Sequence, residues 1–171
     1  EPWKLWDATL ALPESGNRVP DILDEARHGL NWLLRMFPND SDMYNQLGDD
    51  RDHTYWDIPP NDSADYGWGK GKERALYPCT GKPQGLFKYR NRSNGKASTA
   101  GKYASAFALA STVFRKTDPA FSTRLRQKAL VAYAIGRKFP GVCQGAPGNA
   151  PYFYEEDNWV DDMELAAAEL H

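Results

Sequence analysis

The sequence has little net charge and no long run of apolar residues. A formal net charge of −2 gives no reason to expect a nucleic acid or an anionic membrane surface as a partner. No apolar run approaches the ~20 residues that a membrane span needs, and the first ten residues, EPWKLWDATL, lack the pattern of a signal peptide. The sequence therefore predicts neither nucleic acid nor membrane as a partner.

Cysteine is also scarce, because only Cys79 and Cys143 are present. Neither of them lies in a CxxC spacing, which weakens a zinc interpretation. One disulfide, two free thiols and half of a metal site are all compatible with the pair, so the sequence leaves the redox compartment open.

What the sequence does contain is helical periodicity and many aromatic residues, which make up 13% of its 171 residues. That length predicts about one domain. Between Pro20 and Phe37, apolar residues recur at the spacing of one helix face, and Pro20 suits the first helical position. Further helices are expected over Ser98–Arg115, with Ser98 as the N-cap, over Asp118–Lys138, and from Asn158 to the end of the chain.

Two long segments between these helices, Asn39–Ala97 and Pro140–Asn158, show little periodicity. They are too aromatic for simple disorder, and ordered loops of such length are usually functional. The expected fold is an all-α scaffold with aromatic-rich loops gathered at one end. Because the chain starts without Met and stops inside a helical pattern, we expect it to be a piece of something longer.

The loop GDDRDHTYWDIP places His53 and Trp56 three residues apart among several Asp residues. An aromatic face beside polar groups suits a sugar ring, whose CH face stacks while its hydroxyls are hydrogen-bonded. The alternative is a Trp packed under the loop beside a solvated acidic turn. Glycoside hydrolysis needs two carboxyl groups ~5–9.5 Å apart, and the sequence alone cannot select such a pair from so many acids.

The stretch YFYEEDNWVDD combines five carboxylates with four aromatic residues at the start of the last helix. Asn158 is a candidate helix cap, followed by Asp161 and Asp162 in the first turn, where acids stabilise the helix dipole. Capping alone explains part of the charge. The alternative is a hard cation such as Ca²⁺, which takes six to eight oxygen ligands and would neutralise the repulsion among the acids.

Four segments, in this order, resemble glycoside hydrolase family 9, whose cellulases have an (α/α)6 barrel. The segments are SGNRVPDILDEARHGLNWLLRMF, NQLGDDRDHTYWDIPP, the helix pair STAGKYASAFALASTVFRKTDPAFSTRLRQKALVAYAIG, and YFYEEDNWVDDMELAAAELH. The resemblance is collinear over most of the chain and weakest over residues 62–96. It implies a partial (α/α)6 barrel, with residues 1–171 as the central part of a catalytic domain that is incomplete at both ends.

The resemblance also implies roles for individual residues. It implies that His53, Trp56, Phe153 and Tyr154 contact a β-1,4-glucan. It further implies that Asp161 and Asp162, with an oxygen near Asn158, hold a structural calcium ion. The second acid of this pair is Asp where the family has Glu, which shortens its reach.

The family's catalytic base lies in a DAGD motif before the first helix, and its acid is a Glu near the end of the domain. Neither motif occurs here, so no catalytic residue is assigned and the isolated chain is expected to be inactive. In the full-length enzyme the resemblance implies inverting hydrolysis of cellulose or related β-glucans, in a secreted, periplasmic or cell-surface protein. The rest of the catalytic domain is then an expected partner.

Two other functions remain open at this point. A non-catalytic, carbohydrate-binding helical module would share the aromatic loops and would need no acid or base. A family 9 relative that acts as an exo-glucosaminidase would fit the weakly matched loop. Flanking sequence with both catalytic motifs would exclude the first of these.

Overall fold

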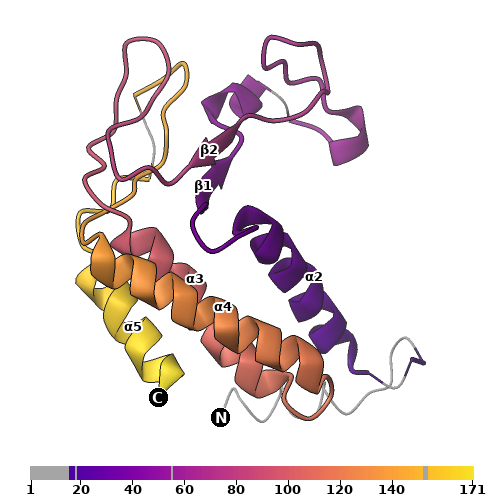
Figure 1. Ribbon diagram of the computed structural model, residues 1–171. Helices are drawn as coiled ribbons and strands as arrows, with labels where there is room; N and C mark the ends of the chain where they lie inside the picture. The colour runs from indigo at the N-terminus through magenta and orange to yellow at the C-terminus, as the bar shows by residue number, and fades with distance from the viewer. Residues whose placement is uncertain (1–15, 18, 55, 152–153) are drawn as a thin grey trace, which may run out of the picture.

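The computed structural model describes residues 16–17, 19–54, 56–151 and 154–171. It is mostly helical, as predicted, and the four expected helices are present (Figure 1). None of the described helices is long and apolar enough to cross a membrane. In chain order the elements are α2 (Asp21–Met36), β1 (Tyr44–Leu47), the 3-10 helices η1 (Asp50–Thr54) and η2 (Pro59–Asn61), β2 (Leu76–Pro78), α3 (Ala97–Val113), α4 (Pro119–Lys138) and α5 (Val160–Leu170).

The helical core is centred on α3, which packs against both α4 and α5 (Figure 1). Ala100, Ala104 and Ala108 of α3 are fully buried in it. A Cβ atom on Gly101 would lie only 2.7 Å from the carbonyl oxygen of Asp162 at the start of α5. Small residues therefore let these helices approach closely, which explains why this stretch of the sequence is so rich in alanine.

The guanidinium of Arg27 connects helix α2 to the turn between α3 and α4 and to the start of α4. Arg27 donates a hydrogen bond of 2.8 Å to Asp118, and its guanidinium lies 4.3 Å from the ring centroid of Phe121. Leu30 and Leu34 contribute the buried face of α2 to the core. The apolar stripe predicted for this helix is confirmed at these positions.

The sequence predicts three helix caps, at Ser98, at Asp118 (through the dipeptide Asp118-Pro119) and at Asn158, and their outcomes differ. The N-cap of α5 is Trp159, one residue after Asn158, whose side chain accepts the backbone N–H of Val160 at 3.1 Å. Asp118 caps α4, because its carboxylate accepts the backbone N–H of Phe121 at 2.9 Å. Ser98 does not cap α3, and this prediction was wrong: the N-cap is Lys96, and Ser98 lies buried within the first turn. Its hydroxyl instead accepts the backbone N–H of Cys143 at 2.9 Å, so it serves another segment of the chain.

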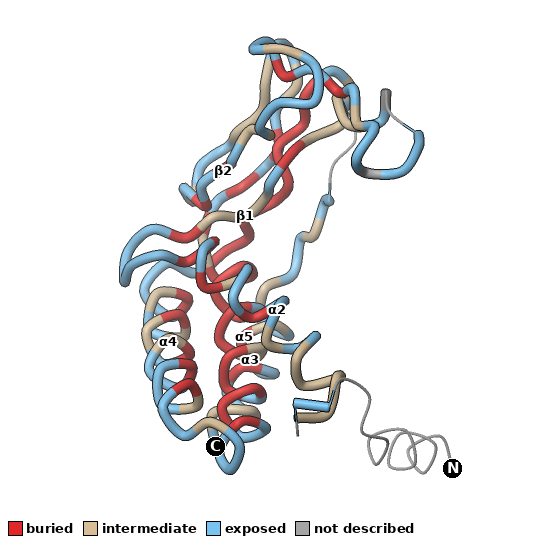
Figure 2. The backbone as a smooth tube through the Cα atoms, turned by 90° about the vertical axis from the view of Figure 1, so that its right-hand side faces the viewer, coloured by how far each residue is buried: buried red, intermediate tan, exposed pale blue. Residues whose placement is uncertain are grey.

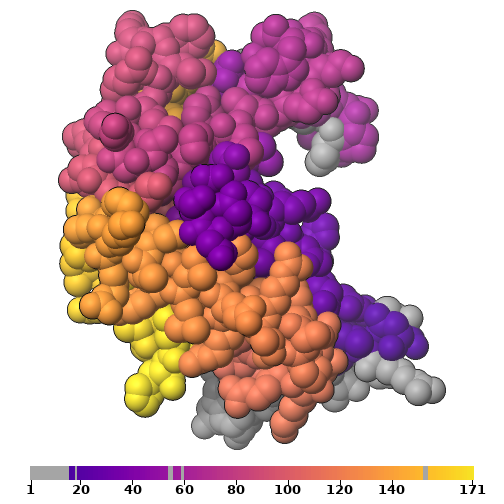
Figure 3. Space-filling model, in the orientation of Figure 1, coloured from indigo at the N-terminus to yellow at the C-terminus, as the bar shows by residue number. Residues whose placement is uncertain are grey.

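A two-stranded antiparallel sheet lies within the first long segment, and the sequence did not predict it. Strands β1 and β2 pair Tyr44 with Pro78 and Leu47 with Leu76, with an irregularity before Gln46. Strands of four and three residues are too short to show a reliable alternation of apolar and polar side chains. The loops around them gather at one end of the helices, where Figure 3 shows raised lobes with a hollow between them.

Residues 141–148, which we call the buried segment, are all shielded from solvent although they form neither helix nor strand. Figure 2 shows buried backbone continuing from the helices into the loops at the far end. The sequence GVCQGAPG was expected to be part of a long loop, and loops usually run over the surface because buried backbone groups need partners. This segment therefore joins the helices to the loop end.

Candidate functional site

The two sugar contacts predicted in the first long loop lie on η1 and directly after it. Trp56 is 87% exposed, so its ring is not packed under the loop. The indole N–H donates to the carbonyl oxygen of His53 at 3.0 Å, which ties the ring to the turn that carries the imidazole. An exposed aromatic face held in this way is suited to stacking against a flat apolar surface.

The second long loop presents Tyr154, which is 69% exposed. Its carbonyl oxygen accepts the backbone N–H of Gly145 at 3.2 Å, and its ring centroid lies 5.4 Å from the ammonium of Lys102. Phe153, also predicted to contact sugar, lies outside the described residues. Trp56 and Tyr154 thus place an exposed ring on each of the two loops, while sugar contact by His53, Trp56, Phe153 and Tyr154 stays a prediction.

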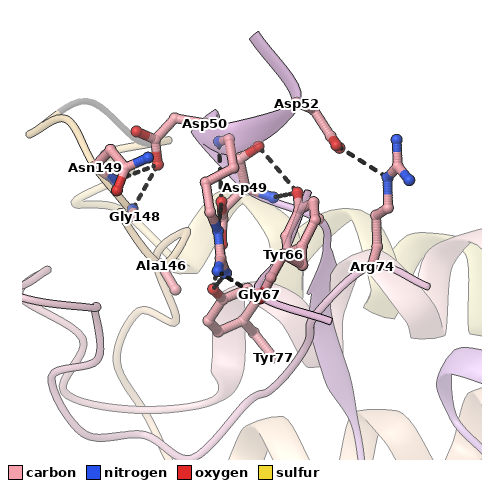
Figure 4. Close-up of polar contacts among 12 residues, drawn as sticks. Asp49, Asp50, Asp52, Tyr66, Gly67, Arg74, Tyr77, Ala146, Gly148 and Asn149 are labelled. Atoms are coloured by element: carbon pink, nitrogen blue, oxygen red, sulfur yellow. Dashed lines mark hydrogen bonds and ion pairs between the residues drawn. The ribbon is translucent and has the colours of Figure 1, made fainter. Parts of the chain in front are cut away.

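A network of polar side chains lies beneath this loop end and is centred on Asp49 (Figure 4). The fully buried Asp49 carboxylate receives two hydrogen bonds from Arg51, at 2.6 and 2.8 Å, and one from the hydroxyl of Tyr77. The backbone N–H of Asp49 donates to the hydroxyl of Tyr66 at 2.7 Å, and Arg51 lies 4.1 Å from that ring's centroid. Asp49 therefore organises three side chains, those of Arg51 and Tyr77 through its carboxylate and that of Tyr66 through its backbone.

Two groups of this network, the Asp49 carboxylate and the Tyr77 phenol, have pKa values that differ from their ordinary values. Burial alone would raise the pKa of Asp49, but the hydrogen bonds from Arg51 and Tyr77 outweigh it and hold that pKa below its ordinary value. Burial and the neighbouring carboxylate raise the pKa of Tyr77 to about 12. The carboxylate thus stays ionised and the phenol stays neutral at neutral pH. A group locked in one state is an anchor and is unsuited to proton transfer.

The neighbouring acids are also used to fold the loop. Asp52 forms an ion pair with Arg74 at 2.9 Å, and Arg74 also binds Asp62. Asp57 accepts the backbone N–H of Ile58 at 2.7 Å, within its own turn. The density of acids that suggests a catalytic pair in the sequence is thus accounted for by these contacts.

The buried segment obtains most of its N–H hydrogen bonds from side chains of distant residues. A buried N–H group without a partner is costly, and this segment has no ladder of its own. The acceptors for its N–H groups are Asn94 for Val142 (2.8 Å), Ser98 for Cys143 (2.9 Å), Ser93 for Gln144 (2.9 Å), Gln46 for Ala146 (2.8 Å) and Asp50 for Gly148 (2.6 Å). Each acceptor fixes one point of the segment.

The carbonyl oxygens of Gln144, Gly145 and Ala146 are bound by side-chain amides, whereas those of Gly141, Val142 and Pro147 accept backbone N–H groups. Asn91 donates to the carbonyl oxygens of Gln144 and Gly145 at 3.1 and 2.9 Å. Gln46 donates to the carbonyl of Ala146 at 3.1 Å while accepting its N–H, so one side-chain amide imitates a strand partner. Sequence reasoning missed these residues, although NRSN at 91–94 is a dense run of hydrogen-bonding side chains.

The acids that precede α5 are neutralised largely by two basic residues. Arg92 lies 3.3 Å from Glu155 and 3.4 Å from Asp157, in exposed ion pairs. Lys102 of α3 forms an ion pair with Glu156, and its ammonium lies 3.4 Å from a carboxylate oxygen of Asp162. Side chains on other parts of the chain therefore relieve much of the repulsion that the sequence alone leaves unexplained.

The residues predicted to hold calcium face solvent or have partners within the chain. Asp161 is exposed, Asp162 is paired with Lys102, and Asn158 accepts the backbone N–H of Val160 at 3.1 Å. Burial raises the pKa of Asp162, with only partial relief from Lys102. Among the described residues, no group of three or more His, Cys, Asp or Glu side chains could hold a metal ion. Calcium binding at Asp161, Asp162 and Asn158 stays a prediction.

The two cysteines lie together in the core as buried free thiols. Their side chains are in hydrogen-bond contact, which raises the pKa of Cys79 and lowers that of Cys143. Of the three states that the sequence left open, the structure has the pair as thiols. The contact brings β2 and the buried segment together beside α3.

Comparisons with known proteins agree on one family. The family model for glycosyl hydrolase family 9 matches residues 3–171. Endoglucanase 1 of Arabidopsis thaliana is 27% identical over 157 residues, which are 90% of this chain and 28% of that protein. Endoglucanase C of Cellulomonas fimi is 30% identical over 173 residues, with 98% of this chain and 14% of that protein covered. The chain thus spans less than a third of these relatives.

Solved structures agree on the fold. The cellulase Cel9M of C. cellulolyticum, in complex with cellobiose, matches with a TM-score of 0.65 at 24% identity and covers 98% of this chain and 34% of that one. The endoglucanase of the termite Nasutitermes takasagoensis matches with a TM-score of 0.53 at 22% identity, over 82% of this chain and 28% of that one. The predicted partial (α/α)6 barrel is thereby confirmed.

Proposed function

The chain belongs to glycosyl hydrolase family 9, and from that membership we propose that it is part of an enzyme that hydrolyses β-1,4-glucosidic bonds in cellulose or related β-glucans. In an inverting mechanism a general acid protonates the leaving oxygen while a general base activates water on the opposite face of the sugar. No residue of this chain is assigned either role. Cellulose is too large to enter a cell, so we place the whole enzyme in a secreted, periplasmic or cell-surface location.

Residues 1–171 contribute the binding and orientation of the glucan. Holding a substrate in a reactive geometry supplies a large part of catalysis, even when the holding residues never touch the reacting atoms. The observation that carries the proposal is the ring of Trp56, which is 87% exposed and tied through its indole N–H to the carbonyl of His53. An exposed aromatic face with restricted motion loses little entropy when a sugar stacks on it.

Replacing Trp56 by Ala in the full-length enzyme tests this role. We expect kcat/KM on cellohexaose to fall about five- to tenfold, because one aromatic stacking contact is worth roughly 1 kcal/mol. Trp56→Phe keeps an aromatic face and should retain most of the activity. The measurement is steady-state hydrolysis of cellohexaose by each variant.

The same loop offers a matched control in Trp68. It is also exposed, at 52%, and its indole N–H likewise donates to a backbone carbonyl, that of Glu73 at 2.7 Å. Trp68→Ala should change kcat/KM less than about twofold. An unchanged kcat/KM in Trp56→Ala, or equal losses in the two Ala variants, would remove the support for Trp56 as a sugar platform.

A further inference from the structure

The carboxylate of Asp50 accepts three consecutive backbone N–H groups from the end of the other long loop. Its Oδ1 receives the N–H of Gly148 at 2.6 Å and that of Asn149 at 3.0 Å, while Oδ2 receives the N–H of Ala150 at 2.6 Å. Figure 4 shows Asp50 turned toward Gly148 and Asn149 and away from the Asp49 network. We call this arrangement the Asp50 clamp.

The clamp depends on residue types at both ends. A Cβ atom on Gly148 would collide with Oδ1 of Asp50 and would come within 2.9 Å of a carboxylate oxygen of Asp49, so any larger residue there would displace these carboxylates. Three N–H groups that converge on one carboxylate form a concave site for negative charge. Charge-assisted hydrogen bonds of this kind are among the stronger ones in proteins. Two segments about a hundred residues apart are thereby held together.

The clamp joins the two loops that carry the exposed rings. Asp50 is the first residue of η1, which contains His53 and is followed by Trp56. On the other side, the segment it holds continues to Tyr154, whose carbonyl is in turn bound by Gly145. The relative placement of the two rings therefore depends on how firmly Gly145 and its neighbours are fixed to η1.

We propose that Asp50 is a positioning residue that sets the separation of the Trp56 and Tyr154 rings for glucan binding. This inference rests on the proposed function, because the rings must contact sugar for their spacing to matter. Asp50 acts through the loop that it holds and need not touch the substrate. Its role is to keep two stacking faces at a distance that one glucan chain can bridge, which lowers the cost of ordering them on binding.

A carboxylate is required because both of its oxygens accept hydrogen bonds. In Asp50→Asn, one oxygen becomes an NH₂ group, which would face the N–H of Gly148 or of Ala150 with no acceptor between them. The substitution keeps size and shape but breaks at least one bond of the clamp. Asp57→Asn is the matched control, because Asp57 lies in the same loop and its hydrogen bonds to described residues stay within its own turn, at Ile58 and Asn61.

The test combines hydrogen exchange with kinetics in the full-length enzyme. In Asp50→Asn we expect the amides of residues 148–150 to exchange about tenfold faster or more. We expect KM for cellohexaose to rise about fivefold while kcat stays within about twofold, since binding and not chemistry is disturbed. Asp57→Asn should change neither quantity. Gly148→Ala disturbs the clamp from the other side and should raise KM in the same direction.

Two results would overturn the proposal. Unchanged exchange at residues 148–150 in Asp50→Asn would mean that the clamp does not hold the loop. Faster exchange with an unchanged KM in both Asp50→Asn and Gly148→Ala would mean that the clamp is structural and does not position the rings. Failure of the proposed function is recognised separately, by an unchanged kcat/KM in Trp56→Ala while the clamp variants still exchange faster.

Discussion

Helix α3 and the buried segment are both shielded from solvent, yet their backbones are satisfied in different ways. In α3 the backbone groups bind within the helix, and the side chains at Ala100, Ala104 and Ala108 serve only to pack. In the buried segment most N–H groups and several C=O groups bind side chains of distant residues such as Gln46 and Asn91, and the other bonds are to backbone groups outside the segment. The stability of α3 therefore depends on the close packing of small side chains, and that of the buried segment depends on individual polar side-chain atoms.

This difference predicts where substitutions are costly. Removing a polar side chain from a helix surface leaves the backbone bonds of the helix intact. Removing a side chain that binds the buried segment leaves a buried amide or carbonyl without a partner, at about 1–3 kcal/mol for each group. The loop end should therefore lose stability in discrete steps, one for each polar side chain removed.

The largest effect is expected for Asn91→Ala. Asn91 is buried and makes four hydrogen bonds: it accepts the N–H groups of Gln84 and Ser93 and donates to the carbonyl oxygens of Gln144 and Gly145. Its loss should lower the free energy of unfolding by about 3 kcal/mol or more. Urea denaturation followed by tryptophan fluorescence measures this.

The control for that variant is Asn39→Ala. Asn39 also accepts backbone N–H groups, those of Ser41 and Asp42, but in an exposed turn where water can replace it. Its loss should cost less than about 1 kcal/mol. Equal effects of the two substitutions would show that burial of the segment does not set the cost.

Smaller losses of stability are expected when two buried serines of α3 are replaced by alanine. Ser98→Ala removes the acceptor for the N–H of Cys143, and we expect a loss of about 1–2 kcal/mol. Ser111→Ala removes a hydroxyl that donates to Ala108 of its own helix, and it should cost less than about 0.5 kcal/mol. Thermal denaturation of both variants measures these losses of stability. A larger loss in Ser111→Ala than in Ser98→Ala would contradict the prediction.

Acid should disrupt the loop end before it disrupts the packed helices. The folded-state pKa of Asp49 is lowered, so its stabilising contribution is present above the unfolded value near 3.9 and is lost as pH falls through the folded pKa. The pKa of Asp162, between α3 and α5, is raised by burial, so protonation there relieves a cost. On acidification, the near-ultraviolet circular dichroism of the loop aromatics should fall before the helical signal at 222 nm. Coincident transitions would count against this order.

A further small loss of stability is expected for Lys102→Met. The side chain of Lys102 is 45% exposed, so Lys102→Met should cost only about 0.5–1 kcal/mol by leaving Glu156 and Asp162 without their ammonium. Circular dichroism melts of the variant measure this loss. A loss well above 1 kcal/mol would mean that the ion pairs contribute more than exposed pairs usually do.

The same melts test the predicted calcium site at Asp161 and Asp162. Binding to the folded state would raise Tm on addition of millimolar calcium, and EDTA would reverse the rise. No change in Tm in either the parent protein or Lys102→Met would contradict the calcium prediction.

Helix positions could be predicted from the sequence because their signals are local. The stripe through Leu30 and Leu34 and the Asp-Pro cap at Asp118 each lie within one element. The misassigned cap at Ser98 shows the limit, since its hydroxyl binds Cys143, 45 residues away. No local pattern reports such a partner.

The residues of the candidate site also divide into those that local sequence could predict and those that it could not. The motif containing His53 and Trp56 could be recognised because its residues are adjacent in sequence. The roles of Asp49, Asp50 and Gln46 could not be predicted, because each depends on a segment brought close only by the fold. Acids that look like catalytic candidates in the sequence therefore become anchors once their partners are known.

Native-state hydrogen exchange of the unmodified protein tests the central claim most directly. If side chains satisfy the buried segment as described, the amides of Val142, Cys143, Gln144 and Ala146 should exchange as slowly as the central amides of α3, close to the rate set by global unfolding. Exchange of these amides at the rate of the exposed amides near Trp56 would contradict the account.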